Sequence, residues 1–203
     1  MLKKSDYPNT FIVADTETTG VSNDDVIIEI GAVKVKDWEI VSMFQTFIRP
    51  KKYANEIDPF DSTGDYVWDG NKRVNLIPED AKKINHITNN MLKDAPNEFE
   101  GLTLFKGFIQ DDLVLFHNAG FDTRMINAGY KRCFGDTFPN PIGDTLKIAR
   151  KLYPDLTSHK LENLANMFGV VNEAAHRAAD DAKTTFLVLK RMLQANEGQG
   201  SFF

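Results

Sequence analysis

Two carboxylates separated by one residue stand at the end of the first apolar segment of the chain. Asp15 and Glu17 directly follow residues 11–14, a short β-prone run with the sequence FIVA. Because side chains alternate across a strand, Asp15 and Glu17 are expected to share a face with Phe11 and Val13. Two acids on one face of a strand end could hold a metal ion, but solvated acids are also common at such positions.

Polar residues also follow a second short strand, predicted at residues 113–116. His117 and Asn118 come directly after it, at the carboxyl end, where open α/β sheets bind ligands. Asp122 lies a few residues further on, in the apolar stripe of a helix predicted at residues 122–134. A buried carboxylate requires a partner or a metal ion, whereas an Asp at a helix start also serves as a cap, and both interpretations stay open.

A third group lies at the start of the last helix, predicted at residues 175–193. The apolar stripe of this helix consists of Ala178, Ala182, Phe186, Leu189 and Leu193. At about 100° per residue, Asp181 lies at the edge of the stripe and Asp180 points nearly opposite. We therefore expect Asp181 to be a metal ligand and Asp180 to be solvated, with His176 close to Asp181. The alternative is a surface histidine beside an ordinary acidic helix start.

Four acids and one histidine thus occur at the ends of elements that one sheet edge can bring together. Oxygen ligands select hard divalent cations, so the pattern predicts Mg²⁺ or Mn²⁺ as the cofactor. The single cysteine, Cys133, excludes a thiolate zinc site and an internal disulfide. The chain contains neither a Walker A motif nor G-x-G-x-x-G, so it lacks the usual phosphate loops for nucleoside triphosphates and dinucleotides.

The elements that must position these residues begin as strands. Three neighbouring strands are predicted at residues 11–14, 26–35 and 41–48, the last two joined as a hairpin by the polar turn at residues 36–39. Helices are predicted at residues 97–109, 122–134, 144–152, 160–167 and 175–193. Strands first, and then strands alternating with helices, indicate an α/β fold with a mixed sheet covered by helices.

The length of 203 residues suits a single domain, which we place at residues 1–195. Residues 51–75 show no sustained period but hold Tyr53, Phe60, Tyr66 and Trp68, so we expect a long ordered insertion there. Residues 196–203 begin polar and Gly-rich, and a flexible C-terminal tail is expected.

The charge balance limits the partners. A formal net charge of −5 argues against a protein that coats long nucleic acid, because such proteins neutralise many phosphates. It does not argue against one that grips a few nucleotides at a strand end. No apolar run approaches the ~20 residues of a membrane-spanning helix, and the N-terminus lacks the apolar stretch of a secretion signal. With one cysteine as well, a cytoplasmic location without a membrane partner is expected.

The three polar groups together resemble the motifs of DEDDh exonucleases, the DnaQ-like group that includes the proofreading epsilon subunit of bacterial DNA polymerase III and RNase T. The motifs are D-x-E at residues 15–17, H-N-x-x-F-D at 117–122 and H-x-x-x-x-D at 176–181. Further matches are D-T-E-T-T-G at 15–20, I-T at 87–88 with A-P at 95–96, D-T-L at 144–146 and H-K-L at 159–161. The similarity runs from about Phe11 to Leu193 and departs in two places. Residues 51–75 exceed the connection typical of the family, and N-H-I-T at 85–88 stands where the family often has H-G-I-T.

The resemblance implies a ribonuclease H-like α/β fold, a five-stranded mixed sheet flanked by helices. It implies that Asp15, Glu17, Asp122 and Asp181 hold two Mg²⁺ or Mn²⁺ ions and that His176 is the general base. Two such metals can clamp an in-line displacement at phosphorus, with nucleoside 5′-monophosphates as products.

The resemblance also suggests contacts to the substrate, a 3′ end of single-stranded DNA, with RNA as the alternative. Thr16, Thr18, Thr19 and Gly20 would cradle the terminal nucleotide, and Val21 would wedge against the last base. His117 and Asn118 would contact a phosphate or a sugar. The activity expected is that of a 3′–5′ exonuclease in proofreading or repair. An exoribonuclease of the RNase T or oligoribonuclease type and a non-catalytic module that binds a strand end are the alternatives.

The last five residues, from Gln199 to Phe203, resemble the short peptide with which bacterial replication proteins bind the sliding clamp. Two aromatic residues after a flexible linker could anchor in a hydrophobic pocket. A DNA polymerase and its clamp are therefore expected partners, and a frayed terminus is the alternative.

Overall fold

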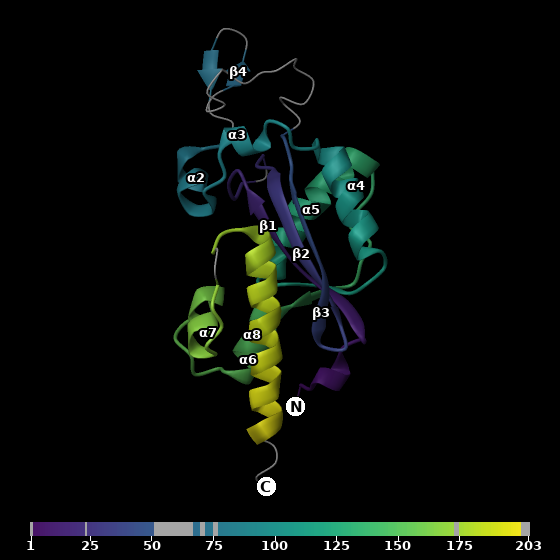
Figure 1. Ribbon diagram of the computed structural model, residues 1–203, viewed down its shortest axis with the longest axis vertical. Helices are drawn as coiled ribbons and strands as arrows, with labels where there is room; N and C mark the ends of the chain where they lie inside the picture. Colours follow the sequence, from purple (N-terminus) through teal and green to yellow (C-terminus); the bar gives the residue numbers. More distant parts are fainter. Residues whose placement is uncertain are drawn as a thin grey trace.

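The computed structural model describes residues 2–22, 24–50, 67–69, 72–74, 77–172 and 175–199, without the side chains of 67–69, 72–74 and 199. Five strands form the central sheet, in the order β3-β2-β1-β6-β7 (Figure 1). They are β1 (Thr10–Thr18), β2 (Ile27–Lys36), β3 (Glu39–Phe47), β6 (Val114–Phe116) and β7 (Ile142–Asp144). β1, β2 and β3 pair antiparallel, whereas β6 pairs parallel to β1 and β7 parallel to β6. The predicted mixed sheet of five strands is thus confirmed.

Helices cover both faces of the sheet (Figure 1). They are α2 (Glu79–Asn85), α3 (Asn89–Leu92), α4 (Glu98–Ile109), α5 (Ala119–Phe134), α6 (Thr145–Leu152), α7 (Leu161–Met167) and α8 (Ala178–Gln199), with a short 3-10 helix at Lys4–Asp6. The alternation along β1 divides the core in two. Ile12 and Ala14 pack with α4 and α5, while Phe11 and Val13 pack with α6, α7 and α8.

Local sequence signals explain several element boundaries. Asn97 caps α4 by accepting a hydrogen bond from the amide of Glu100, and Asp144 caps α6 through the amides of Leu146 and Lys147. Between β2 and β3, Asp37 and Trp38 both have positive φ angles, the backbone of a tight hairpin turn.

The insertion expected at residues 51–75 lies largely outside the described residues. Its described part is a two-stranded hairpin of β4 (Val67–Asp69) and β5 (Lys72–Val74), which Figure 1 draws beyond α2 and α3.

The C-terminal helix is longer than predicted. α8 continues to Gln199, so the flexible tail expected from residue 196 is helical over its first four residues. The reason is anchoring at the N-terminus: Asn196 Nδ2 donates to Leu2 O over 2.8 Å, and Lys4 N donates to Glu197 Oε1 over 3.0 Å. Residues 200–203, which carry most of the clamp-like sequence, lie outside the described residues.

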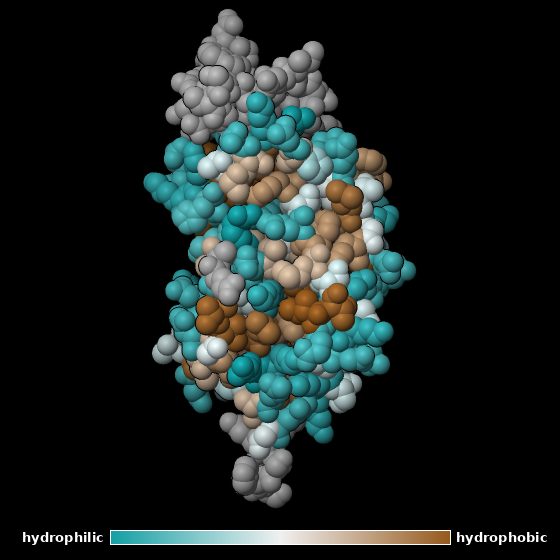
Figure 2. All heavy atoms as spheres, in the orientation of Figure 1, coloured by the Kyte–Doolittle hydropathy of each residue, from teal (hydrophilic) through white to brown (hydrophobic). Residues whose placement is uncertain are grey.

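Apolar atoms reach the surface in a band across the middle of the face that carries α8, and hydrophilic residues cover most of the described surface around it (Figure 2). None of the described helices is long and apolar enough to cross a membrane.

Candidate active site

The two acids of β1 lie on the face of the sheet that α8 covers, as the alternation predicted. Asp15 and Glu17 follow Phe11 and Val13 along this face, and both carboxylates are partly buried. On the neighbouring strand, Asp15 is opposite Gly31 and Glu17 is opposite Glu29. A Cβ on Gly31 would lie 2.0 Å from the backbone nitrogen of Ala179, so only glycine lets the start of α8 approach the sheet this closely.

Asp122 reaches β1 from the opposite layer, where α5 packs. Its side chain is 4% exposed and accepts two hydrogen bonds from Thr16, one from the backbone N (3.1 Å) and one from Oγ1 (2.8 Å). α5 begins at Ala119, three residues earlier than predicted, so Asp122 lies inside the first turn. The capping interpretation of Asp122 is wrong, because the cap position of α5 is Asn118 and the Asp122 carboxylate accepts two hydrogen bonds from Thr16 on β1.

His176 and Asp181 meet at the start of α8. A ring nitrogen of His176 and one carboxylate oxygen each from Glu17 and Asp181 all lie within 4.8 Å of one another. Asp181 accepts hydrogen bonds from Asn172 Nδ2 (2.6 Å) and from the backbone N of His176 (3.0 Å). A cavity of about 570 Å³ opens beside His176 and Asp181, so there is room for a ligand at this cluster.

The backbone at His176 is held in an unfavourable conformation. Its φ angle is +65°, in the left-handed region that non-glycine residues rarely adopt. The hydrogen bond from the His176 backbone N to Asp181 fixes this residue on one side. On the other side, the next two residues, Arg177 and Ala178, are fixed by contacts to the buried carboxylate of Glu29. Glu29, which is fully buried on β2, accepts hydrogen bonds from Arg177 Nη2 (2.9 Å), Arg177 Nε (3.3 Å) and Ala178 N (3.3 Å), and also from Gln45.

The sequence analysis missed Glu29, Arg177 and Asn172. A lone glutamate inside the apolar run of β2 was the one available signal, because a buried carboxylate must have a partner. The partner itself could not be identified, since Arg177 lies 148 positions away along the chain.

Burial and mutual repulsion disfavour the charged form of all four acids. The pKa of Asp15 is raised well above its usual range by burial and by the nearby charges of Asp122, Glu17 and Asp181. Burial, followed by the charge of Asp181, raises the pKa of Glu17 to about 8. Burial likewise raises the pKa of Asp122, to about 7, and that of Asp181.

This donor set fits divalent metal ions. Burial raises the pKa of all four carboxylates, and nearby acids raise those of Asp15 and Glu17 further, so a cation between them would stabilise their charged form. The compact cluster is Glu17, His176 and Asp181, while Asp15 and Asp122 approach it from β1 and α5. Asp180 is not part of the cluster.

Three of the residues expected to touch substrate are occupied within the protein. Thr16 Oγ1 donates to Asp122, Thr18 Oγ1 donates to the carbonyl of Gly20 over 2.6 Å, and Thr19 Oγ1 donates to Asp25 over 2.8 Å. These hydroxyls shape the loop after β1 from inside.

The next two residues of the loop differ. A Cβ on Gly20 would lie 2.6–2.8 Å from the Asp25 carboxylate, which explains this glycine without a ligand. Val21 is 76% exposed and stays available for contact, and its carbonyl accepts a hydrogen bond from Arg124.

His117 is also engaged on both sides. Its Nδ1 lies 3.0 Å from Thr145 Oγ1, and its Nε2 lies 2.9 Å from the carbonyl of His159. Burial lowers the pKa of His117, so the neutral ring donates from Nε2 and accepts at Nδ1. No ring nitrogen is left for a phosphate, and the geometry favours a role in joining α6 to the segment before α7. Asn118, an exposed residue with a φ angle of +73°, remains free to contact substrate.

The fold and the acidic cluster define a nuclease, and comparison with known proteins agrees. The family model described as Exonuclease (RNase_T) matches residues 12–60 and 70–189, and the chain belongs to this exonuclease family. The predicted ribonuclease H-like fold and the DnaQ-like relationship are thereby confirmed.

The relatives include replication proteins. The chain is 35% identical over 186 residues to the DNA polymerase III subunit epsilon of Treponema pallidum. The aligned region covers 90% of this chain and 76% of that protein. It is 40% identical over 185 residues to the PolC-type DNA polymerase III of Clostridium perfringens, covering 91% of this chain. The match spans 11% of the PolC-type protein.

Solved structures share the fold at lower identity. Escherichia coli exonuclease I in complex with a dT13 oligonucleotide has a TM-score of 0.73 at 19% identity, covering 95% of this chain and 42% of that one. Exonuclease X in complex with 5′ overhanging duplex DNA has a TM-score of 0.66 at 23% identity and covers 93% of both chains.

Proposed function

We propose that this chain is a metal-dependent 3′–5′ exonuclease that releases nucleoside 5′-monophosphates from the 3′ end of DNA, in proofreading or repair. The observation that carries the proposal is the joining of Glu17, His176 and Asp181 at one point, with Asp15 and Asp122 next to them. A histidine beside carboxylates can act as a general base near neutrality, and a bound divalent cation would keep the acids in their anionic form.

The fit of the four carboxylates supports two Mg²⁺ or Mn²⁺ ions, with Asp15, Glu17, Asp122 and Asp181 as ligands. When bound, the metals would supply electrostatic stabilisation of the charge that develops on the phosphate and on the departing 3′ oxygen.

The protein's own groups would do the rest. A ring nitrogen of His176 would accept one proton of the attacking water, a new P–O bond would form, and the bond between phosphorus and the 3′ oxygen would break. The departing 3′ oxygen would take up a proton from solvent. The shortened strand keeps a 3′-hydroxyl, and the released nucleotide carries a 5′-phosphate. Asp181 fixes the backbone of His176, and Thr16 orients Asp122 through two hydrogen bonds.

DNA is favoured because the relatives that cover most of this chain are named as parts of DNA polymerase III. The same relatives support association with a polymerase. RNA is the second candidate, since a 3′-exonuclease solved with a histone mRNA stem-loop shares the fold, with a TM-score of 0.69. The clamp-binding peptide at residues 199–203 stays a prediction, and truncation after Gly198 with unchanged clamp affinity would contradict it.

The test is digestion of 5′-labelled single-stranded DNA and RNA of the same sequence with Mg²⁺, Mn²⁺ or EDTA. We expect a ladder that shortens from the 3′ end, requires metal, is faster on DNA and is absent in Asp15→Ala. A faster ladder on RNA would favour the exoribonuclease. Folded protein that binds strand ends but cuts neither substrate, alone or with a polymerase, would favour the non-catalytic module.

A further inference from the structure

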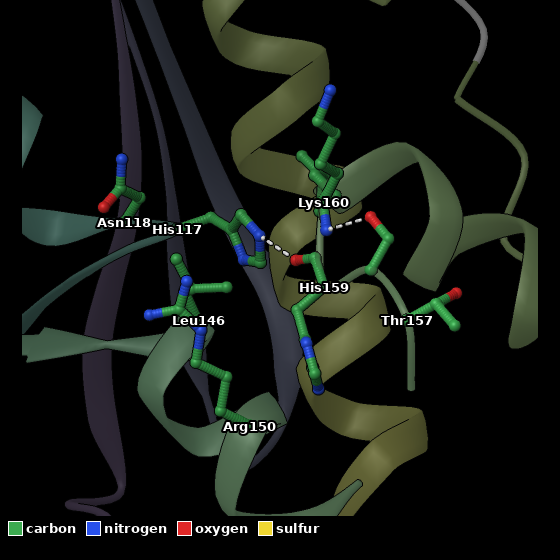
Figure 3. Close-up of a pocket in the computed structure, with 9 residues that line it drawn as sticks. His117, Asn118, Leu146, Arg150, Thr157, His159 and Lys160 are labelled. Carbon is green, nitrogen blue, oxygen red and sulfur yellow. Dashed lines mark hydrogen bonds between the residues drawn. The ribbon is translucent and has the colours of Figure 1, made fainter. Parts of the chain in front are cut away.

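A second cavity, of about 490 Å³, is lined by residues that follow β6, by α6 and by the segment before α7 (Figure 3). The lining residues are His117, Asn118, Leu146, Arg150, Thr157, Ser158, His159, Lys160 and Leu161. Leu161 also lines the cavity beside His176 and Asp181, so the two cavities adjoin at the start of α7.

The walls of the second cavity are fixed by hydrogen bonds. His117 connects Thr145 with the carbonyl of His159, and Nε2 of His159 in turn lies 2.8 Å from the carbonyl of Tyr153. Ser158 Oγ accepts from Asn163 over 2.7 Å. The segment opposite α6 is therefore held in place before any ligand arrives, which lowers the entropic cost of binding.

The charge of the cavity differs from that of the whole chain. Arg150 and Lys160 are exposed cations, and none of the nine lining residues is acidic, although the chain has a net charge of −5. Within the described part of the chain, neither cation forms an ion pair. Figure 3 shows the Arg150 side chain extending from α6 toward His117 and Asn118, whereas the Lys160 side chain extends from the opposite wall in the other direction, away from Arg150.

Asp144, which precedes α6 and does not line the cavity, is already engaged. Asp144 Oδ1 accepts hydrogen bonds from the backbone amides of Asn118 (3.3 Å), Leu146 (2.9 Å) and Lys147 (3.3 Å). Its charge is spread over the first turn of α6, so the positive side chains of the cavity remain available to an anion.

The spacing matches a polynucleotide that also occupies the acidic cluster. β1, β6 and β7 are neighbouring parallel strands, so their carboxyl ends lie on one edge. Asp15 and Glu17 lie near the end of β1, and His117 follows β6. Neighbouring strands lie about 5 Å apart, and His117, which follows β6, lines the second cavity, so the wall of this cavity begins one strand away from β1. A strand bound at the acids would reach it with a neighbouring nucleotide.

We propose that this cavity binds the sugar-phosphate backbone upstream of the 3′ terminus, with Arg150 and Lys160 each contacting a different phosphate. The inference rests on the proposed function, because the strand enters the cavity from the acidic cluster. Contacts to phosphates carry no base information, so the subsite holds any sequence and lengthens the region of strand that is gripped.

The test compares two substrates with Arg150→Gln and Lys160→Gln. Thymidine 5′-(4-nitrophenyl phosphate) has one phosphate and reaches only the acidic cluster, whereas an oligonucleotide also reaches the second cavity. We expect each substitution to raise KM for the oligonucleotide by about 10-fold, with a much smaller change on the ester. The slope of log KM against log salt should fall by about 1 for each cation removed. Lys151→Gln, a neighbouring exposed lysine outside the cavity, is the matched control and should leave both substrates unchanged.

Equal effects on both substrates, or none on the oligonucleotide, would overturn the proposal. A binding measurement keeps it separate from the proposed function. Fluorescence anisotropy with a labelled single strand and the Asp15→Asn protein should show the same 10-fold weakening for each cation substitution, and this result does not depend on turnover. If the strand binds, loses affinity in both variants and is never cut, the exonuclease proposal fails and the phosphate subsite stands.

Discussion

The two ends of the central sheet differ in the side chains that they bring together. Aromatic rings cluster where β1 begins, and acidic groups cluster where β1 ends. Where β1 begins, rings pack against one another: Trp38 lies 5.4 Å from Tyr7, 5.3 Å from Phe11 and 6.2 Å from Phe186, between ring centroids. An ion pair lies at the same end, where Lys190 Nζ is 2.6 Å from Glu39 Oε1.

Where β1 ends, four acids crowd together with raised pKa values, and His176 has a positive φ angle. The comparison shows that favourable packing and costly chemistry are kept apart on one sheet. Damage to the first end should therefore reduce stability, and damage to the second should reduce activity.

The largest effect is expected for Asp15→Asn. Loss of this central carboxylate should lower kcat/KM by about 10⁴-fold, which corresponds to about 5.5 kcal/mol of transition-state stabilisation. Single-turnover digestion of labelled DNA measures it. Asp180→Asn is the control on α8 and should be mild. If Asp180→Asn lost its activity while Asp181→Asn kept it, the assignment of Asp181 to the inward side of α8 would be wrong.

At the other end, Phe186→Ala should act on stability alone. Phe186 is 1% exposed between Phe11 and Trp38, and its removal should lower the free energy of unfolding by about 4 kcal/mol. Urea denaturation measures the loss, and Phe99→Ala, at a half-exposed phenylalanine, should cost clearly less. Activity per folded molecule should stay near normal at low temperature. A loss of turnover in the folded protein would contradict the idea that this end of the sheet contributes to stability alone.

His176→Ala should lower kcat by about 100-fold because the base for the water is lost. Metal binding, followed by calorimetry with Mn²⁺, should persist through the four carboxylates. A variant with a near-native rate would remove His176 from the proposed mechanism.

Glu29→Gln tests whether the buried ion pair positions His176. Because the ion pair between Glu29 and Arg177 is lost, His176 is held less firmly, and kcat should fall by about 10-fold while KM stays constant. In a His176→Ala background the same substitution should have no further effect, since only the base is displaced. A full additional loss in that background would show that Glu29 acts on Asp181 or on the fold instead. Glu39→Gln, in the exposed pair with Lys190, is the matched control.

The smallest effect concerns stability against pH in EDTA. The folded protein holds protons on Asp122 and Glu17 up to about pH 7 and about pH 8, whereas the unfolded chain releases them near ordinary carboxyl values. Stability should therefore fall as pH rises from about 5 to about 8, lowering Tm by about 5 °C, and then level off. Asp122→Asn should flatten this slope. A Tm that rises over the same range would contradict the raised pKa values.

Sequence patterns located the acids because alternation and helix phase are local properties. The face shared by Asp15 and Glu17, the buried side of α5 and the choice of Asp181 over Asp180 all follow from the spacing of apolar neighbours. The five-stranded sheet followed from the order of the elements and from the resemblance to DnaQ-like exonucleases.

The remainder depended on contacts between distant segments. Thr16 is expected from the motif to contact substrate, whereas in the structure its hydroxyl donates to Asp122, 106 positions further along the chain. Glu29 resembled an ordinary strand residue without Arg177. The end of α8 was misjudged because Asn196 and Glu197 are helical through contacts with the N-terminus. The residues around a position do not reveal which distant residue it contacts in the fold.

The contact between Leu2 and Asn196 places the two ends of the described fold side by side, at the far end of the sheet from the acids (Figure 1). A domain whose first and last described residues lie close together can be inserted into a surface loop of another protein without disturbing its own core. It could also be joined through its ends and reopened elsewhere. A circular permutant opened within residues 51–75 should then keep the acids in register, because in the sequence that segment separates β3 from α2, and its described strands β4 and β5 form a sheet of their own.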